Sequence, residues 1–311
     1  MITLTINGKK IKAQAGRTIL EVARDNDIHI PTLCYSDALK PAGNCRLCTV
    51  EVICESRTTL ETSCNYLIQE GMQVETASER VQAVRKLVME LLLARCPNPK
   101  KLREVGFEVG VDAVPPQFSL ENEYCILCGL CVRSCSEIVQ ADAIDFEGSG
   151  INKKVAVPFN ETSPDCIGCG SCVFTCPTQV IKMQDMDDAK IIYVEGEEDL
   201  GPQRMMRNWK TELNLKMCKG CGNPLAPEKQ LTSLRDKMIL PMEFFDYCQT
   251  CRAYPEIDEE KCLGCGGCSD NCPCCALELK EVEKEIKANC YTGNCTGCRI
   301  CIDICPNGAI S

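Results

Sequence analysis

Aromatic side chains and histidine are scarce in this chain. Its 311 residues include 7 Phe, 7 Tyr, 1 Trp and 1 His. So few large rings cannot fill sizeable hydrophobic cores. A Ser–His–Asp or Cys–His catalytic group cannot be assembled around a histidine that stands alone. We expect that histidine, His29, to have a surface or packing role.

Long apolar runs are also missing. The longest, near Leu87–Ala94, is interrupted by Glu90 and falls short of the roughly 18 residues of a membrane span. The first residues show no basic region followed by an apolar one, so no signal peptide is predicted, and we expect a cytoplasmic protein. The formal net charge of −10 makes nucleic acid a poor partner, since its phosphates need a positive surface.

Cysteine, in contrast, is abundant, with 29 residues. In a reducing cytosol such a density indicates metal ligation and not disulfides. Four copies of the spacing C-x2-C-x2-C-x3-C recur, and this spacing is typical of paired 4Fe–4S clusters in which the fourth cysteine of each copy binds the other cluster. The crossing rule predicts four ligand sets: Cys125, Cys128, Cys131 and Cys176; Cys166, Cys169, Cys172 and Cys135; Cys262, Cys265, Cys268 and Cys305; and Cys295, Cys298, Cys301 and Cys272.

Residues 1–77 combine elements of a small ferredoxin domain. The segment ITLTI, the turn Asn7-Gly8 and the following lysines predict a hairpin, and residues 17–24 have helical periodicity. Next come Cys34, Cys45, Cys48 and Cys64, with a small-residue loop between them that leads into a strand. This order resembles the plant-type 2Fe–2S ferredoxin fold, a β-grasp, in the variant found at the amino terminus of NuoG-type subunits of complex I and related hydrogenases. The resemblance implies one 2Fe–2S cluster on these four cysteines.

The resemblance extends to about residue 195, with one departure. Ser78 is expected to cap a helix that ends at Cys96-Pro97. NuoG-type proteins usually carry a histidine-ligated 4Fe–4S cluster in this region. Here residues 90–124 contain no histidine and only Cys96, so we expect residues 78–114 to be a helical connector without that cluster. Residues 115–195 then form the first module with two 4Fe–4S clusters, whose first motif closely resembles the NuoG-type sequence.

Residues 185–199 are acidic and predict a solvated linker with a short strand at residues 190–194. Residues 196–256 contain the end of this linker and a different four-cysteine pattern. Two C-x2-C hooks, Cys218/Cys221 and Cys248/Cys251, flank a helix expected at Glu228–Met238. Such hooks resemble a zinc ribbon with one structural Zn²⁺. A further iron–sulfur cluster is the alternative. Residues 257–311 hold the second 4Fe–4S pair. The fold class is therefore α+β: an N-terminal β-grasp 2Fe–2S domain and two bacterial-type dicluster ferredoxin modules separated by a zinc-ribbon-like module.

Five cysteines remain outside these sets: Cys54, Cys96, Cys274, Cys275 and Cys290. The first two are expected to be small core side chains. The other three crowd the second dicluster module, where they either shield the last cluster or ligate it in an altered arrangement.

The sequence has no G-x-G-x-x-G between a strand and a helix and no Walker loop, so no nucleotide or flavin site is evident. The expected function is single-electron relay through one 2Fe–2S and four 4Fe–4S clusters. The resemblance implies docking to a NuoF-like flavin- and NADH-binding subunit. The second dicluster module suits exchange with ferredoxin or a second flavoprotein or redox subunit. The whole looks like the iron–sulfur subunit of electron-bifurcating NADH:ferredoxin oxidoreductases, including Stn-type transhydrogenases. Two alternatives remain: the diaphorase-side subunit of a soluble NAD-linked hydrogenase or formate dehydrogenase, and an iron–sulfur or zinc regulatory scaffold.

Overall fold

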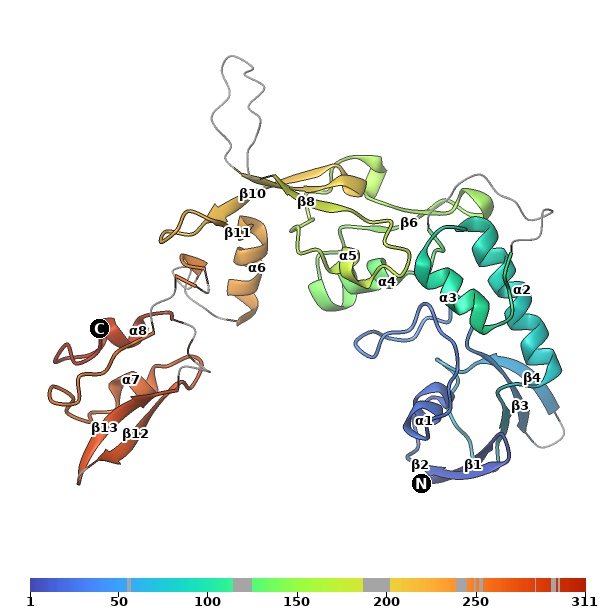
Figure 1. Cartoon of the computed structure of the whole chain (residues 1–311), viewed down its shortest axis with the longest axis horizontal. Helices are drawn as coiled ribbons and strands as arrows, with labels where there is room; N and C mark the ends of the chain where they lie inside the picture. The colour runs from blue at the N-terminus through green and yellow to red at the C-terminus, as the bar shows by residue number, and fades with distance from the viewer. Residues whose placement is uncertain are drawn as a thin grey trace, which may run out of the picture. The chain divides into compact units, whose positions relative to one another are not determined.

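Figure 1 shows the chain as a computed structural model. It describes residues 1–54, 57–113, 125–186, 202–238, 245–248, 250–251, 254–282, 284–291, 295 and 297–311. The chain divides into two compact units. The first comprises Met1–Cys166, Gly170–Met183 and Met206–Thr211, and the second comprises Ile167–Cys169, Gln184–Met205 and Glu212–Ser311. In the described part of the chain, none of the helices combines the length and the apolar character that crossing a bilayer requires.

A five-stranded mixed sheet forms the N-terminal part of the first unit. Its strands are β1 (Ile2–Ile6), β2 (Lys9–Ala13), β3 (Thr49–Cys54), β4 (Arg57–Thr62) and β5 (Gln73–Glu75), in the spatial order β2-β1-β5-β3-β4. β1 runs parallel to β5 and antiparallel to β2, and β3 runs antiparallel to both of its neighbours. Asn7 and Gly8 join β1 to β2 with φ of 50° and 78°. The predicted hairpin is therefore confirmed, and its turn uses the two positive φ angles that Asn-Gly favours.

One short helix, α1 (Ile19–Asp25), packs on this sheet. Thr18 begins it with a capping box, because the Thr18 hydroxyl accepts from the Glu21 backbone N–H while the Glu21 carboxylate accepts from Thr18 N–H. The buried face of α1, which includes Ile19 and Leu20, joins the alternate inward residues of the strands in one core. This sheet with its single helix is the expected β-grasp.

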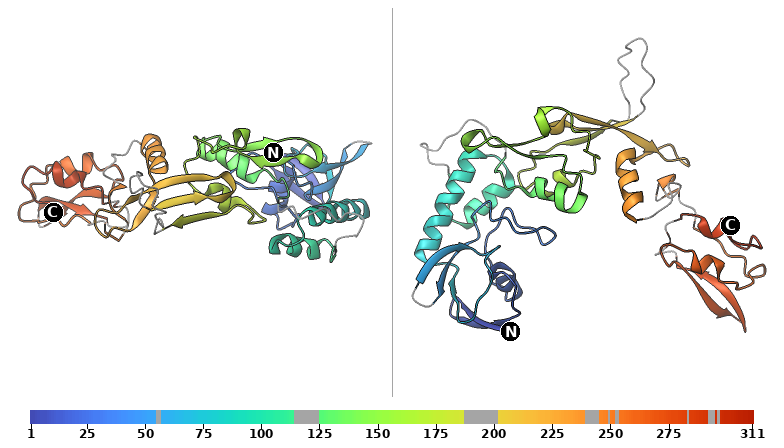
Figure 2. Two further views of the ribbon diagram at one scale, coloured as in Figure 1. Left: turned by 90° about the horizontal axis from the view of Figure 1, so that it is seen from above. Right: turned by 180° about the vertical axis from the view of Figure 1, so that it is seen from behind.

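Two helices follow the sheet and lie side by side in the views of Figures 1 and 2: α2 (Glu79–Arg95) and α3 (Lys100–Glu108). Ser78 caps α2 by accepting from Val81 N–H, and Cys96 ends it, as the sequence predicts. Cys96 is fully buried among apolar side chains of both helices.

The rest of the first unit is built from short elements. They are α4 (Leu130–Arg133), a π-helical segment (Ser134–Val139), β6 (Asp145–Glu147), β7 (Lys154–Ala156), α5 (Ser171–Thr175) and 3₁₀ turns at Gly150–Asn152, Pro158–Asn160 and Arg207–Trp209. β6 and β7 form an antiparallel pair. α5 packs against both α4 and the π-helical segment.

Three strands and a helix begin the second part of the chain: β9 (Gln203–Met206), β10 (Thr211–Met217), β11 (Pro224–Pro227) and α6 (Glu228–Met238). With β8 (Met183–Met186) the strands form a sheet in the order β11-β10-β9-β8. α6 has the bounds that the sequence predicts. Asp185, at the start of the predicted acidic linker, lies in β8. The strand expected at residues 190–194 and most of that linker lie outside the described residues.

The C-terminal part of the second unit contains α7 (Gly267–Asp270), β12 (Leu277–Val282), β13 (Glu285–Cys290) and α8 (Ile300–Asp303). β12 and β13 form an antiparallel hairpin, and an isolated bridge pairs Ile257 with Ile310. The small hydrophobic core of this C-terminal part includes several of the motif cysteines.

Candidate functional site

The loop before β3 carries three of the four cysteines predicted to bind a 2Fe–2S cluster, and the turn after β4 brings the fourth, Cys64, to them. Cys34, Cys45, Cys48 and Cys64 are each at most 3% exposed. The thiol of Cys34 contacts that of Cys45, and the thiol of Cys48 contacts that of Cys64. Two adjacent pairs are the arrangement that a 2Fe–2S cluster needs, since each of its two irons binds two thiolates.

In each thiol pair one thiol becomes easier to ionise and the other harder, because hydrogen bonding within the pairs raises the pKa of Cys45 and of Cys64. Contact with the Cys45 thiol lowers the pKa of Cys34 to about 6, and contact with the Cys64 thiol lowers the pKa of Cys48 to about 7. The backbone N–H of Cys45 also lies 3.4 Å from Cys34 Sγ. Because iron binds the thiolate and N–H donors stabilise it, these residues fit the predicted group.

Two arginines bring positive charge close to this loop. Arg85 of α2 is 8% exposed, and its Nε and Nη2 donate to the carbonyl of Thr49, next to Cys48, over 3.0 and 2.7 Å. Arg133 of α4 donates from Nη2 to the carbonyl of Cys34 over 2.6 Å. Its Nε is buried and has no hydrogen-bond partner among the described residues. Such cations would offset the negative charge of a thiolate-bound cluster.

Arg133→Gln is therefore expected to lower the midpoint potential of the 2Fe–2S centre by tens of millivolts, on the order expected for one charge at short range. The sign follows because reduction adds negative charge, which the lost cation no longer stabilises. Potentiometric titration followed by electron paramagnetic resonance measures this. Arg24→Gln is the control, since Arg24 is an exposed residue of α1 paired with Asp37. Equal potentials in both variants would contradict the expectation.

The same loop contacts the first 4Fe–4S motif. Asn44 Nδ2 donates to the carbonyl of Cys128 over 3.1 Å, and the backbone N–H of Lys40 donates to Glu137 over 2.8 Å. Gly129 has φ of 73°, and a Cβ there would lie 2.8 Å from Asn44 Nδ2. The close approach of the two candidate centres thus depends on a glycine within the C-x2-C-x2-C motif.

In the first module the structure brings Cys176 to the motif that begins at Cys125. The surroundings of the buried Cys131 thiol include Cys128, Cys125 and Cys176, and also Cys172 of the second predicted set. Burial raises the pKa of Cys128 to about 12. The two ligand sets of this module, with Cys176 in the first and with Cys166, Cys169, Cys172 and Cys135 in the second, both stay predictions from the spacing.

Cys135 lies in the π-helical segment. It is the one fourth cysteine that no proline follows. The chain continues there as a π-helix until Gln140, whose φ of 57° ends it. π-helical turns are rare and often occur at functional sites.

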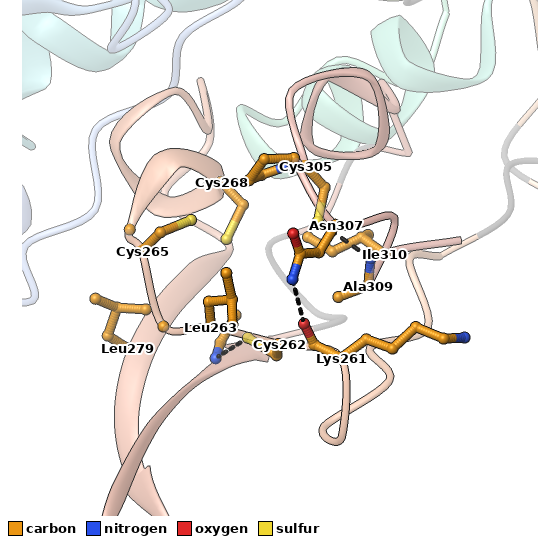
Figure 3. A pocket seen from close by; sticks show the side chains of 14 residues that line it. Lys261, Cys262, Leu263, Cys265, Cys268, Leu279, Cys305, Asn307, Ala309 and Ile310 are labelled. Atoms are coloured by element: carbon orange, nitrogen blue, oxygen red, sulfur yellow. Dashed lines mark hydrogen bonds between the residues drawn. The ribbon is translucent and has the colours of Figure 1, made fainter.

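In the C-terminal module, Figure 3 shows a cavity that the thiols of Cys262, Cys265, Cys268 and Cys305 share. Cys305 comes from the second motif and the other three from the first. The backbone N–H of Ala288 lies 3.4 Å from Cys262 Sγ, and that of Ala309 lies 3.2 Å from Cys305 Sγ.

A second cavity of this module is lined by the other predicted set, Cys272, Cys295, Cys298 and Cys301, and also by Cys274. Backbone N–H groups again approach the sulfurs, from Ala276 to Cys272 Sγ over 3.2 Å and from Gly297 to Cys295 Sγ over 3.4 Å. Both cavities therefore offer four thiols and N–H donors, which is the donor set a 4Fe–4S cluster uses.

The two C-x2-C hooks of the second unit come together. The ligand atoms of Cys218, Cys221, Cys248 and Cys251 all lie within 4.8 Å of one another, and this is the one such group found among the described residues. Thiolates on one tetrahedral ion lie about 3.8 Å apart, because each metal–sulfur bond is about 2.3 Å. The spacing thus fits a single ion. Hydrogen bonds from the backbone N–H groups of Cys248, Cys221 and Gly220 lower the pKa of Cys218 to about 6.

Close packing at Gly220 and ion pairs at Asp246 hold the two C-x2-C hooks in place. A Cβ at Gly220 would lie 2.9 Å from Cys251 Cβ, so the hooks approach closely there. Asp246 receives ion pairs from Lys216 and Lys219 over 2.6 Å each, and its carbonyl accepts from Lys219 N–H over 2.8 Å. The two lysines hold the pKa of the Asp246 carboxyl below its ordinary value.

The remaining cysteines and the histidine have varied surroundings. Cys96 is buried and Cys54 is half-buried against the sheet core, as expected of packing residues. Cys275 is exposed, and Cys290 lies against Cys295. His29 is 73% exposed and pairs with Glu108 over 2.5 Å, which agrees with a surface role. Sequence reasoning missed Arg85 and Arg133, since no local pattern marks either.

Comparison with protein families finds three matches. Residues 1–79 match a 2Fe–2S iron–sulfur cluster binding domain, residues 165–226 a 4Fe–4S dicluster domain, and residues 291–311 a 4Fe–4S binding domain. The second match covers both the motif that begins at Cys166 and the first C-x2-C hook.

Several curated relatives are similar to the chain. The NADPH-Fe(3+) oxidoreductase subunit alpha of Geobacter sulfurreducens is 32% identical over 57% of this chain and 24% of its own length. The NADP-reducing hydrogenase subunit HndD of Solidesulfovibrio fructosivorans is 33% identical over 57% of this chain and 35% of its own length. The mitochondrial NADH-ubiquinone oxidoreductase 78 kDa subunit of Candida albicans is 29% identical over 57% of this chain and 28% of its own length. The chain thus spans about a quarter to a third of these relatives.

Among solved structures, an NAD⁺-reducing [NiFe]-hydrogenase in the H₂-reduced state matches with 29% identity and a TM-score of 0.44, over 50% of this chain and 74% of that one. The family matches and the fold together show that the chain consists of a 2Fe–2S domain at its N-terminus followed by 4Fe–4S dicluster domains and a four-cysteine site.

Proposed function

We propose that this chain relays single electrons between a flavin- and NAD(H)-binding partner subunit and a low-potential carrier such as ferredoxin, within an electron-bifurcating NADH:ferredoxin oxidoreductase or transhydrogenase. The observation that carries the proposal is the series of separate thiol sets, each with backbone N–H donors or buried sulfurs suited to one iron–sulfur cluster. When bound, such clusters accept and release one electron at a time. The ligand sets and the domain bounds 1–77, 78–114, 115–195, 196–256 and 257–311 belong to the proposal.

The residues of the chain have three tasks in this function. The thiols bind the metal, while the N–H groups, Arg85 and Arg133 set the local charge. Asn44 and Arg133 also hold the 2Fe–2S loop against the first 4Fe–4S motif. A short distance between the 2Fe–2S centre and the first 4Fe–4S centre would favour electron transfer from one to the other. The Cys218 site is proposed to bind Zn²⁺, whose lack of redox chemistry would make it a brace between the modules.

The proposed partners follow from chemistry that this sequence lacks. A hydride donor needs a flavin to divide its two electrons, and no nucleotide-binding motif is present in the sequence. The similarity to complex I and hydrogenase subunits supports a NuoF-like partner. The second dicluster module supports a second point of electron transfer, to ferredoxin or to another redox subunit.

A diaphorase-side subunit of a soluble hydrogenase or formate dehydrogenase is the second candidate. The relatives that favour it are the NADP-reducing hydrogenase subunit and a putative formate dehydrogenase of Staphylococcus aureus, 24% identical over 60% of this chain. The two candidates share the relay and differ in the terminal enzyme.

Anaerobic purification of the chain alone tests the relay. We expect about 18 iron atoms and one zinc per chain, the sum of one 2Fe–2S and four 4Fe–4S clusters with the zinc site. NADH should not reduce viologen dyes until a NuoF-like flavoprotein is added. Dye reduction by the chain alone, or about half that iron, would contradict the proposal.

Copurification of the native complex separates the two candidates. Flavoproteins with nicotinamide sites and NADH-dependent ferredoxin reduction are expected of the bifurcating complex. A hydrogenase or molybdopterin subunit, with H₂ or formate oxidation, would establish the second candidate instead.

A further inference from the structure

The C-terminal module is internally symmetric, and its two halves can be compared position by position. The pairing of Ile257 with Ile310 in one half corresponds to that of Cys290 with Leu277 in the other. The N–H group of Ala309 lies 3.2 Å from Cys305 Sγ, and the N–H group of Ala276 lies 3.2 Å from Cys272 Sγ. Any difference between the two cavities is therefore a local change of side chain on a common backbone.

One such difference adds a thiol to the second cavity. Two residues after its fourth cysteine, the first cavity is lined by Asn307, whose amide donates to the carbonyl of Lys261 over 3.4 Å. At the corresponding place the second cavity is lined by Cys274. A thiol there changes the donor set of that cavity from four sulfurs to five.

The distance between Cys272 and Cys274 is that of two ligands of one metal ion. Their Sγ atoms lie 3.9 Å apart. Two thiolates on the same tetrahedral iron are separated by about 3.8 Å, given bonds of about 2.3 Å. Cys274 Sγ therefore needs only a small displacement to reach an iron that Cys272 binds.

We propose that Cys274 is an alternative fourth ligand, which exchanges with Cys272 on the cluster bound by Cys295, Cys298 and Cys301. The inference rests on the proposed function, because it requires a cluster at this site. In the exchange the iron–sulfur bond to Cys272 breaks and one to Cys274 forms. The Cys274 thiol gives its proton to the Cys272 thiolate, and no electron is transferred.

Alanine variants of the fourth ligands test the exchange, with alanine chosen because a serine oxygen can itself bind iron. Cys272→Ala is expected to keep the wild-type iron content and the electron paramagnetic resonance signals of all clusters. The matched control is Cys305→Ala in the symmetric cavity, which has Asn307 in place of the second thiol and is expected to lose up to four iron atoms, one cluster. The double variant Cys272→Ala/Cys274→Ala is expected to lose the same amount.

Two further measurements make the result unambiguous. The double variant Cys272→Ala/Cys290→Ala should keep its iron. If it loses iron while Cys272→Ala/Cys274→Ala keeps it, Cys290 is the alternative ligand and the proposal is wrong. Alkylation of the native protein, followed by mass spectrometry, should label Cys274 less in Cys272→Ala than in the wild type, because a metal-bound thiolate is protected. Equal labelling would also overturn the proposal.

The controls separate this inference from the proposed function. If Cys305→Ala keeps all its iron, the predicted ligand set of the first cavity, and with it part of the proposed function, is wrong. If Cys305→Ala and Cys272→Ala lose iron equally, the relay stands and the exchange does not. The 2Fe–2S signal and the zinc content report in each variant whether the rest of the chain is folded.

Discussion

Cys48→Ala is expected to abolish the 2Fe–2S signal while leaving the 4Fe–4S signals intact. Cys48 is 1% exposed, its thiol contacts Cys64, and the next residue, Thr49, is fixed by Arg85. Loss of this thiol leaves one iron with a single cysteine, and the 4Fe–4S sets contain none of these residues. Electron paramagnetic resonance of the reduced protein, with iron analysis, should show a loss of about two iron atoms.

Cys54→Ala is the matched control for this experiment. Cys54 ends β3, the strand that Cys48 precedes, and is half-buried against the same core. It belongs to none of the predicted ligand sets, so its replacement should leave every signal unchanged. An unchanged 2Fe–2S signal in Cys48→Ala, or its loss in Cys54→Ala, would refute the assignment of the site.

Gly264→Ala is expected to eliminate the cluster of the cavity in Figure 3. Gly264 lies between Cys262 and Cys265 with φ of 62°, and a Cβ there would lie 2.2 Å from the carbonyl oxygen of Ile286 in β13. Backbone cannot give way as a flexible side chain does, so the turn must move away from β13. That movement would break the bonds from Ala288 N–H to Cys262 Sγ and from Lys287 to the Cys262 carbonyl. About four iron atoms should be lost.

Gly266→Ala separates this clash from the cost of the left-handed backbone. Gly266 has φ of 82°, but a Cβ there would meet nothing closer than 3.6 Å. Both variants carry the penalty of about 1–2 kcal/mol for a side chain in this region. We expect Gly266→Ala to keep its iron and to lose only a few degrees in Tm. Equal iron in the two variants would show that β13 does not constrain the turn.

Local patterns predicted much of the fold. The Asn7-Gly8 hairpin, the Ser78 cap and the bounds of α6 follow from turn chemistry, capping and periodicity, which act over a few residues. Cys262, Cys265, Cys268 and Cys305 line one cavity, and spacing with the crossing rule encodes that long-range relation, while their role as ligands stays a prediction.

The parts that could not be predicted are long-range contacts without a repeated spacing. Arg133 reaches the carbonyl of Cys34, and Arg85 that of Thr49, across segments far apart in the chain. The residues next to a helical arginine in the sequence do not indicate whether its side chain is buried or exposed to solvent. The π-helix around Cys135 likewise depends on how that segment packs against α5. Only the structure shows that Cys274 lies within ligand distance of Cys272.

The strand hairpin β12–β13 separates two motifs that each supply thiols to both C-terminal cavities. Neither motif can therefore complete a binding site before the whole module has closed. Since metal binding and folding are coupled where no site exists beforehand, metal should enter this module only after both motifs and the hairpin between them have come together.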